Sequence, residues 1–339
     1  MTKGKSTSGN RSTPIERALA RQGLSPETEA TLRLVGEVKR FAVESLGLKG
    51  DGNYSRYVAV ERDYLVDVVS AAQADSLTPH LWRFPVFGSF PYKGYYVRED
   101  ALREARRLER KGLDVWVRRV DAFSTLGFFS DPVYSFMTDY RPFDLANLII
   151  HEQTHATLFV KDAVQFNEEL ATFMGWEGAL EFLRLRFGAD SEEHRRAVDH
   201  LSDWRRFNEM LLVLHDELEQ AYGRAALAAG GPAAAREAAL AAKQELVAQF
   251  NRELAAQPFR TDAFAGFEGI PANNAYILAV VNYNQDLDLF YRLRAAVGGD
   301  LRRAFTAARQ AVAGKVDPKE ALRSLVESLE RDARAATGS

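Results

Sequence analysis

The stretch LIIHEQTHATLFVKDAVQFNEELA, residues 148–171, contains the motif HEQTH and, after a short gap, the acidic group NEELA. His151 and His155 are four residues apart, so on a helix they lie on nearly the same face, one turn apart. Two imidazoles placed in this way can bind one metal ion at about 2.0–2.1 Å from each nitrogen. Glu152 follows the first histidine and can contact a metal-bound water without binding the metal. Metallopeptidases use this arrangement, in which zinc lowers the pKa of the water and the glutamate takes its proton.

A catalytic zinc ion has three protein ligands and one open position, so the two histidines need a third ligand. The next acidic residues are Glu168 and Glu169, and the first of them comes 168 − 155 = 13 residues after His155, at the start of a second predicted helix. A helix, loop and helix of this length can bring either carboxylate back to the metal. The metzincin pattern is excluded, because its glycine and third histidine are absent from HEQTHATLFVKD.

An ordinary amphipathic helix is the alternative interpretation of this segment. Leu145, Leu148 and Ile149 would give such a helix an apolar face without any metal. The chain has 6 histidines in 339 residues, so a chance match to H-E-x-x-H is expected in roughly one such chain in a hundred. Because the motif lies on a predicted helix and a glutamate-bearing helix follows it, the sequence favours a metal site.

The composition excludes several classes of protein. Lys and Arg number 44 and Asp and Glu 47, a net charge of −3, so no overall positive charge attracts nucleic acid. The absence of cysteine excludes disulfides and thiolate ligands, and leaves imidazole and carboxylate to bind a transition metal. No window has the apolar length of a transmembrane helix, and the N-terminus lacks the apolar core of a signal peptide. We expect a cytoplasmic protein as the sequence stands, and a periplasmic or membrane-anchored one if an export signal has been removed.

The N-terminal part of the chain is predicted to contain the strands. Residues 1–24 are polar and rich in small side chains, which predicts a flexible segment before a single domain of residues 25–339. Ser25, followed by Pro and Glu, begins a helix that ends at Gly47. From Asn53 to Tyr96, runs rich in Val, Tyr and Phe with Gly and Pro between them predict strands and turns. Residues 99–111 predict a charged helix, and LDVWVRRV, residues 113–120, alternates like a strand; this part of the chain extends to about residue 143.

The rest of the chain has helical patterns almost throughout. Residues 144–160 carry HEQTH, residues 167–187 form the next helix, and a long third helix begins at Ser191. The alanine-rich run near Gly230 predicts a helical hairpin. The sequence therefore predicts an α+β fold, with a small sheet-bearing N-terminal part and a mostly helical body that carries the HExxH helix.

The segment HEQTHATLFVKDAVQFNEELATFMGWEGA also resembles a bacterial family described as putative zinc aminopeptidases, a branch of the gluzincin metallopeptidases. The resemblance extends upstream through LRLVGEVKRFAVESLGL, FPVFGSFPYKGYY and KGLDVWVRRVDAFSTLGFFSDPV, and downstream to PANNAYILAVVNY. It covers most of residues 24 to about 310. The resemblance implies a zincin-like fold and a zinc-dependent aminopeptidase that acts on peptides.

Position by position, the resemblance implies that His151, His155 and Glu168 bind Zn²⁺ and that Glu152 is the general base. The pair Asn-Glu in NEELA favours Glu168 over its neighbour as the ligand. Thermolysin-like gluzincins carry an aspartate four residues after the ligand glutamate, which orients a histidine; this chain has Thr172 there. Members of the family often begin with a lipoprotein-type export signal, which this sequence does not show.

Two other functions remain open beside an aminopeptidase. One is a zinc endopeptidase with the same centre, which cleavage of substrates with a blocked N-terminus would identify. The other is a non-catalytic helical binding protein whose zinc site is structural, which metal content without hydrolysis would identify. For either peptidase the expected partner is a peptide substrate.

Further candidates lie outside the motif. Tyr276 and Tyr283 are seven residues apart and share a helix face, from which a hydroxyl could stabilise the oxyanion of the tetrahedral intermediate. Aromatic residues at this spacing more often pack in a core, and the resemblance favours Tyr283 as the catalytic one. Residues 124–127 occupy the place of a substrate-binding edge strand in gluzincins, and an ordinary strand and turn explains them equally well. No pattern selects among the remaining histidines, His80, His194, His200 and His215.

Overall fold

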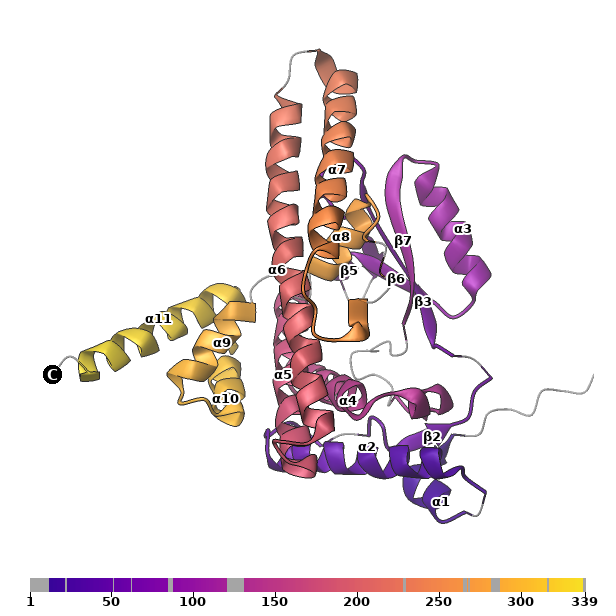
Figure 1. Ribbon diagram of the computed structural model, residues 1–339, viewed down its shortest axis with the longest axis vertical. Helices are drawn as coiled ribbons and strands as arrows, with labels where there is room; N and C mark the ends of the chain where they lie inside the picture. Colours follow the sequence, from indigo (N-terminus) through magenta and orange to yellow (C-terminus); the bar gives the residue numbers. More distant parts are fainter. Residues whose placement is uncertain are drawn as a thin grey trace, which may run out of the picture.

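The structure is a computed structural model that describes residues 12–21, 23–50, 52–61, 63–84, 88–120, 131–227, 230–264, 267, 269–281, 287–315 and 317–337. Within these residues the fold is α+β, mostly helical with small sheets, which confirms the predicted class. The sheets lie in the N-terminal part, and the helical body follows from α4 onward (Figure 1).

The N-terminal residues form a small layer at the base of the molecule. Strand β1 (Thr13–Pro14) pairs with β2 (Arg56–Val58), which pairs in turn with β8 (Val133–Tyr134). Helix α1 (Ile15–Leu19) follows β1 directly and buries Ile15 against the core. The prediction of a flexible segment over residues 1–24 therefore does not hold for residues 13–19, because apolar side chains there anchor the backbone; residues 1–11 and 22 lie outside the described residues.

Helix α2 (Pro26–Glu44) begins where the sequence predicts. The Ser25 side chain accepts a hydrogen bond from the Thr28 N–H at 3.1 Å, which is a standard N-cap. Gly47 has a φ of +74°, a conformation that favours glycine and ends the segment. The buried face of α2 packs against α4.

A three-stranded antiparallel sheet forms the upper part of the molecule, in the order β6 (Tyr92–Tyr95), β3 (Val66–Gln73) and β7 (Leu113–Val120). Helix α3 (Arg98–Glu109) covers one face and α8 (Asn274–Val281) contacts the strands from the other (Figure 1). A separate hairpin joins β4 (Trp82–Phe84) to β5 (Gly88–Phe90). Strand β7 confirms the strand predicted for LDVWVRRV.

The helical body is built on two pairs of helices. Helices α4 (Pro142–Thr157) and α5 (Val164–Phe187) lie side by side near the base, close to the predicted ranges. Helices α6 (Glu192–Ala226) and α7 (Gly231–Ala255) form a long hairpin that rises through the centre (Figure 1), as the alanine-rich run predicts. The C-terminal group projects to the left in that view and consists of α9 (Leu287–Ala296), α10 (Leu301–Val312) and α11 (Pro318–Thr337). Short 3₁₀ turns occur at Ser135–Asp139 and Asp262–Phe264.

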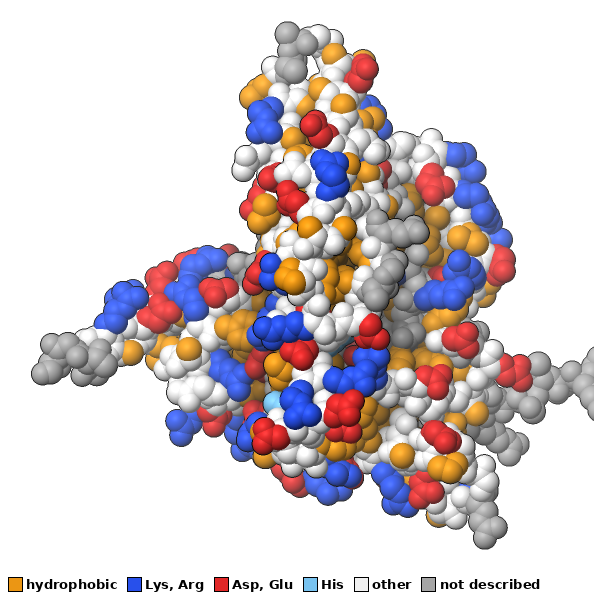
Figure 2. Space-filling view, viewed as in Figure 1, with side chains coloured by type: hydrophobic (Ala, Val, Ile, Leu, Met, Phe, Trp, Pro, Cys, Tyr) orange, Lys and Arg blue, Asp and Glu red, His pale blue; other side chains and the backbone are white. Residues whose placement is uncertain are grey.

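The largest hydrophobic core surrounds α4 and α5, and includes residues of α2, α9 and α10. The surface carries both signs of charge interspersed (Figure 2), in keeping with the nearly balanced composition. Among the described residues, no helix combines the length and apolar character needed to cross a membrane. Helices α4 and α5, which carry the motif, are thus held inside the main core.

Candidate metal centre

Close packing of α5 on α4 brings the acidic group NEELA of α5 close to the HEQTH histidines of α4. Gly175 and Gly178 lie on the face of α5 toward α4, and a Cβ at Gly175 would be 2.4 Å from Asn147 Oδ1 and 3.3 Å from His151 Cβ. A Cβ at Gly178 would be 3.1 Å from Ile150 Cδ1. Since glycine within a helix is unfavourable by about 0.5–1 kcal/mol relative to alanine, its presence twice here indicates a packing requirement. The two glycines, three residues apart within one predicted helix, are the signal of this contact in the sequence.

The loop between the two helices is closed by Asn167. The Val160 N–H donates to Asn167 Oδ1 at 2.8 Å, and Asn167 Nδ2 donates to Val160 O at 2.8 Å. Asn167 is 2% exposed, so the two hydrogen bonds are shielded from water. They tie Val160 of the loop to Asn167 in the first turn of α5, directly before Glu168. In the sequence this asparagine helped to select Glu168 as the ligand, but its bonds to the loop were not predicted.

His151, His155 and Glu168 come together as the spacing and the resemblance predict. Nε2 of His155 lies 3.1 Å from Nε2 of His151. Oε2 of Glu168 lies 3.5 Å from Nε2 of His151 and 3.6 Å from Nε2 of His155. The side chains are 18%, 6% and 13% exposed for His151, His155 and Glu168. Three ligand atoms from two helices therefore share one small, mostly buried space.

The arrangement of these three ligand atoms suits a metal ion such as zinc. Atoms at about 2.0–2.2 Å from a tetrahedral zinc ion lie about 3.3–3.6 Å apart, and the three separations above are close to that range. Two imidazoles and a carboxylate are also a ligand set that zinc accepts in catalytic sites. Within the described residues these three side chains can hold a metal ion.

Glu169 points to a different part of the molecule. Its side chain is 0% exposed and lies 3.1 Å from Lys319 Nζ at the start of α11. An ammonium group neutralises the buried carboxylate there. Of the two adjacent glutamates, the structure places only Glu168 beside the histidines.

The charges in the triad influence one another. Burial alone would lower the pKa of His155, but the charge and hydrogen bond of Glu168 and the charge of Glu152 outweigh it and raise that pKa. Burial alone would raise the pKa of Glu168, but His155 and His151 hold it well below its usual range. The carboxylate of Glu168 therefore stays ionised, which a metal ligand requires.

Glu152 is the neighbour of the triad on α4. It is 9% exposed, and its negative charge contributes to the raised pKa of His155. It is not part of the group of ligand atoms. This placement fits a proton acceptor beside a metal and not a ligand of it.

The orientation of the histidines is only partly explained by the described residues. Nδ1 of His155 is buried and, within those residues, has no hydrogen-bond partner. Thr172, in the place of the gluzincin aspartate, is 6% exposed, and no hydrogen bond joins it to His155 in that part of the chain. Helix packing and the two threonines that flank His155, which bond back to carbonyls of α4, keep this turn in place.

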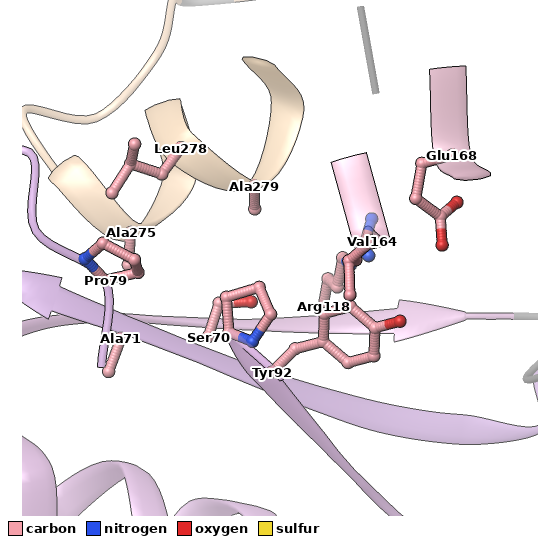
Figure 3. A pocket seen from close by; sticks show the side chains of 11 residues that line it. Ser70, Ala71, Pro79, Tyr92, Arg118, Val164, Glu168, Ala275, Leu278 and Ala279 are labelled. Atoms are coloured by element: carbon pink, nitrogen blue, oxygen red, sulfur yellow. The ribbon is translucent and has the colours of Figure 1, made fainter. Parts of the chain in front are cut away.

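A pocket adjoins the triad on the side of the sheet. Glu168 and Val164 of α5 form one end of it, and strands β3, β6 and β7 and helix α8 supply the rest (Figure 3). Arg118 of β7 and Tyr92 of β6 are the polar side chains beside Val164 in this view. Neither residue belongs to a motif that could be recognised in the sequence.

Of the remaining candidates, those that the structure describes do not join the triad. Tyr283 and residues 124–127 lie outside the described residues, so their predicted roles stay predictions. Tyr276 packs edge-on against Trp116 at 4.8 Å between ring centroids, as the core interpretation expects. The four other histidines lie elsewhere: His80 contacts Trp82, His200 contacts Phe143, His194 caps a loop, and His215 contacts Asp216.

Comparison with known proteins gives one family. A family model with the description "Putative aminopeptidase" matches residues 1–322. No curated protein and no solved structure matches the chain. The match includes both helices of the triad and the strands that border the adjacent pocket.

Proposed function

Because the chain belongs to the putative aminopeptidase family, we propose that it is a zinc-dependent aminopeptidase with a zincin-like fold and a gluzincin-type centre. The observation that carries this proposal is the triad of ligand atoms 3.1–3.6 Å apart, with Glu152 beside it. Two imidazoles and one carboxylate leave a position open for substrate, which a purely structural zinc site does not need.

Each residue of the centre has a separate task. His151, His155 and Glu168 hold the ion, and zinc bound there supplies the Lewis acid that polarises the scissile carbonyl and acidifies the attacking water. Glu152 accepts the proton of that water and returns it to the amine that leaves. The burial of Glu152 keeps its carboxylate away from bulk solvent. We assign to Tyr283 the donation of a hydrogen bond to the developing oxyanion.

The test is a digest of a peptide library, read by mass spectrometry, with elemental analysis of the same sample. We expect about one zinc per chain, stepwise loss of N-terminal residues, and loss of activity with a chelator that zinc restores. Bound zinc with no cleavage of any peptide would instead favour a binding protein with a structural zinc.

An endopeptidase is the second candidate. An aminopeptidase needs an acidic group for the free amine of its substrate, and Glu168, already beside the histidines, is the one carboxylate in the described lining of the adjacent pocket. Paired peptides with free and acetylated N-termini separate the two functions. Cleavage that stops on acetylation supports the aminopeptidase, and internal cleavage of acetylated peptides supports the endopeptidase.

A further inference from the structure

Gly175 of α5 lies directly against the turn of α4 that carries His151. A Cβ at position 175 would be 2.4 Å from Asn147 Oδ1, 3.1 Å from Asn147 O and 3.3 Å from His151 Cβ. Non-bonded heavy atoms pack best at about 3.5–4.0 Å, so all three contacts would be too short. Only glycine fits between the two helices at their present separation.

Two of these three atoms cannot turn aside. Asn147 Oδ1 is the end of a side chain and can rotate away, but Asn147 O belongs to the backbone of α4, and His151 Cβ carries a proposed metal ligand. A methyl group at position 175 would therefore be accommodated by a shift of a few tenths of an ångström in α5 or in His151. Metal–ligand distances in a working site are held to within about 0.2 Å, so a shift of this size matters to the site.

Gly175 lies on the same face of α5 as the third ligand. Glu168 comes 175 − 168 = 7 residues earlier, which is two helical turns and nearly the same direction. The face that glycine lets approach α4 is thus the face that presents Glu168 to His151 and His155, at 3.5 and 3.6 Å between the ligand atoms. The distance between the helices at Gly175 therefore sets how far Glu168 lies from the imidazoles.

We propose that Gly175 sets the separation of α4 and α5 at the triad and thereby fits the site to an ion of the size of zinc. The inference rests on the metal binding in the proposed function. Gly175 is a positioning residue, because it has no side chain to bind the ion and acts through His151 and Glu168. A side chain at this position widens the site, which disfavours zinc and is tolerated better by a larger ion.

Two other helical glycines are matched controls. A Cβ at Gly178, three residues further along α5, would be 2.9 Å from Leu46 Cδ1 and 3.1 Å from Ile150 Cδ1, which are ends of apolar side chains and not ligands. A Cβ at Gly223 of α6 would have no heavy atom of the described residues within 4 Å. The same change to alanine thus meets a ligand-bearing turn, an apolar contact or open space.

The experiment measures the affinity of the full-length chain for Zn²⁺ and for Cd²⁺, each by competition with a chromogenic chelator. Cd²⁺ has the same filled d shell and a larger radius, so the ratio of the two affinities reports the size of the site. Gly175→Ala should lower zinc affinity about tenfold, the low end of the range for residues that support a ligand, and cadmium affinity less. Gly178→Ala and Gly223→Ala should keep the wild-type ratio, and Gly223→Ala should raise the melting temperature, because alanine favours a helix.

A second substitution relieves the closest overlap. Asn147 Oδ1 is buried and, in the described part of the chain, has no hydrogen-bond partner, so Asn147→Ala breaks no hydrogen bond of this atom there. Asn147→Ala alone should keep the wild-type ratio, and in the Gly175→Ala background it should recover part of it, since the contacts to Asn147 O and His151 Cβ remain. If Gly175→Ala alone does not fold, the double variant is compared with Asn147→Ala and should have the lower ratio of zinc to cadmium affinity.

The ratio separates positioning of the ligands from general stability. A variant that only destabilises the fold loses affinity for both ions equally, so an equal loss, or no loss, in Gly175→Ala would overturn the proposal. Because the measurement needs no turnover, it also separates the proposal from the peptidase function. A lowered ratio in a chain that cleaves no peptide supports the role of Gly175 and contradicts the peptidase, whereas an unchanged ratio in a chain that cleaves peptides contradicts only the role of Gly175.

Discussion

Helix α5 carries several buried or mostly buried glutamates, and two of them, Glu168 and Glu177, have partners of different kinds. Glu168, near the start, lies beside the imidazoles of His151 and His155. Glu177, further along, accepts hydrogen bonds from Arg205 Nη2 at 2.5 Å and from the Arg294 guanidinium. A neutral imidazole has a lone pair for a metal, whereas arginine keeps its proton and has none. The same residue type on the same helix is therefore suited to metal binding at one end and to an internal ion pair at the other.

The ion-pair cluster at Glu177 has a structural role. The Tyr291 hydroxyl also donates to Glu177 Oε1 at 3.1 Å, so α5, α6 and α9 are joined through one carboxylate. Burial, with the charge of Glu177, raises the pKa of Tyr291, which keeps the hydroxyl protonated as a donor. Two arginines and a tyrosine thus bind this carboxylate within the protein, as an internal network of ion pairs and hydrogen bonds.

The largest expected effect distinguishes these two glutamates directly. Glu168→Ala should reduce zinc from about one per chain to near none, because two imidazoles alone are an incomplete ligand set. Glu177→Gln should keep its zinc but lower the free energy of unfolding by about 2–3 kcal/mol, less than for a fully buried pair because the arginines are partly exposed. Elemental analysis and denaturant unfolding of both variants measure this.

Glu169→Ala is the control for the choice between the adjacent glutamates. It removes the partner of Lys319 and should lower stability without removing zinc. Full zinc in Glu168→Ala together with loss of zinc in Glu169→Ala would mean that the triad has been assigned to the wrong neighbour.

A second prediction separates metal binding from catalysis. Glu152→Gln has nearly the same shape but cannot accept a proton, so it should keep about one zinc per chain and lose about 10²–10⁴-fold in kcat. Elemental analysis and steady-state kinetics on the same preparation measure both quantities. Zinc loss in this variant would make Glu152 part of the ligand set, and unchanged kcat would remove it from the chemistry.

A third prediction compares a tyrosine with a proposed catalytic role, Tyr283, with a tyrosine that packs in the core, Tyr276. Tyr283→Phe should lower kcat by about 10²–10³-fold with little change in KM, because its hydroxyl is proposed to contact only charge that develops in the transition state. Tyr276→Phe should leave kcat unchanged, since Tyr276 packs against Trp116. Steady-state kinetics and melting temperatures of both variants distinguish the catalytic role from the packing role. If Tyr283→Phe lowers the melting temperature and spares kcat, Tyr283 is a core residue.

Local patterns made part of this picture predictable from the sequence. The four-residue spacing of His151 and His155 fixes their common helix face without knowledge of the rest of the chain. The cap at Ser25 and the alternation in β7 are equally local, and both predictions are confirmed. The choice of Glu168 came from the resemblance, because spacing alone allowed either glutamate to turn toward the histidines.

Features that depend on tertiary contacts were not predictable. The position of Arg118 in the pocket depends on the register of β7 against β3, which are about fifty residues apart in sequence. The polar composition of residues 1–24 predicted flexibility, but Ile15 finds a place in the core that only the assembled fold provides. The contact of Asn167 was not predictable either. Its partners are the backbone N–H and C=O of Val160, and any residue type at that position would offer the same groups.

The smallest expected effect concerns two asparagines that make the same contact in different places. Asn167 makes two hydrogen bonds to the backbone of Val160 beside the triad. Asn251 makes the same pair to Ile270, with Nδ2 to O at 2.9 Å and N to Oδ1 at 2.8 Å, on α7. Alanine at either position leaves a backbone N–H and C=O without these partners, at about 1–3 kcal/mol for a buried group. Both variants should therefore melt at a lower temperature than the wild type.

Only the Asn167 variant should also affect the metal. Its hydrogen bonds tie the loop at Val160 to the residue directly before Glu168. Their loss lets that carboxylate move relative to His151 and His155, and support of this kind typically changes metal affinity by about 10–100-fold. Competition with a chromogenic zinc chelator at a temperature where both variants are folded gives the affinity. We expect weaker zinc binding in Asn167→Ala and wild-type binding in Asn251→Ala. The two substitutions remove the same pair of hydrogen bonds, so a difference in zinc affinity between them can come only from an effect on the ligand Glu168. Equal affinities would therefore show that the Asn167 contact stabilises the fold without positioning Glu168.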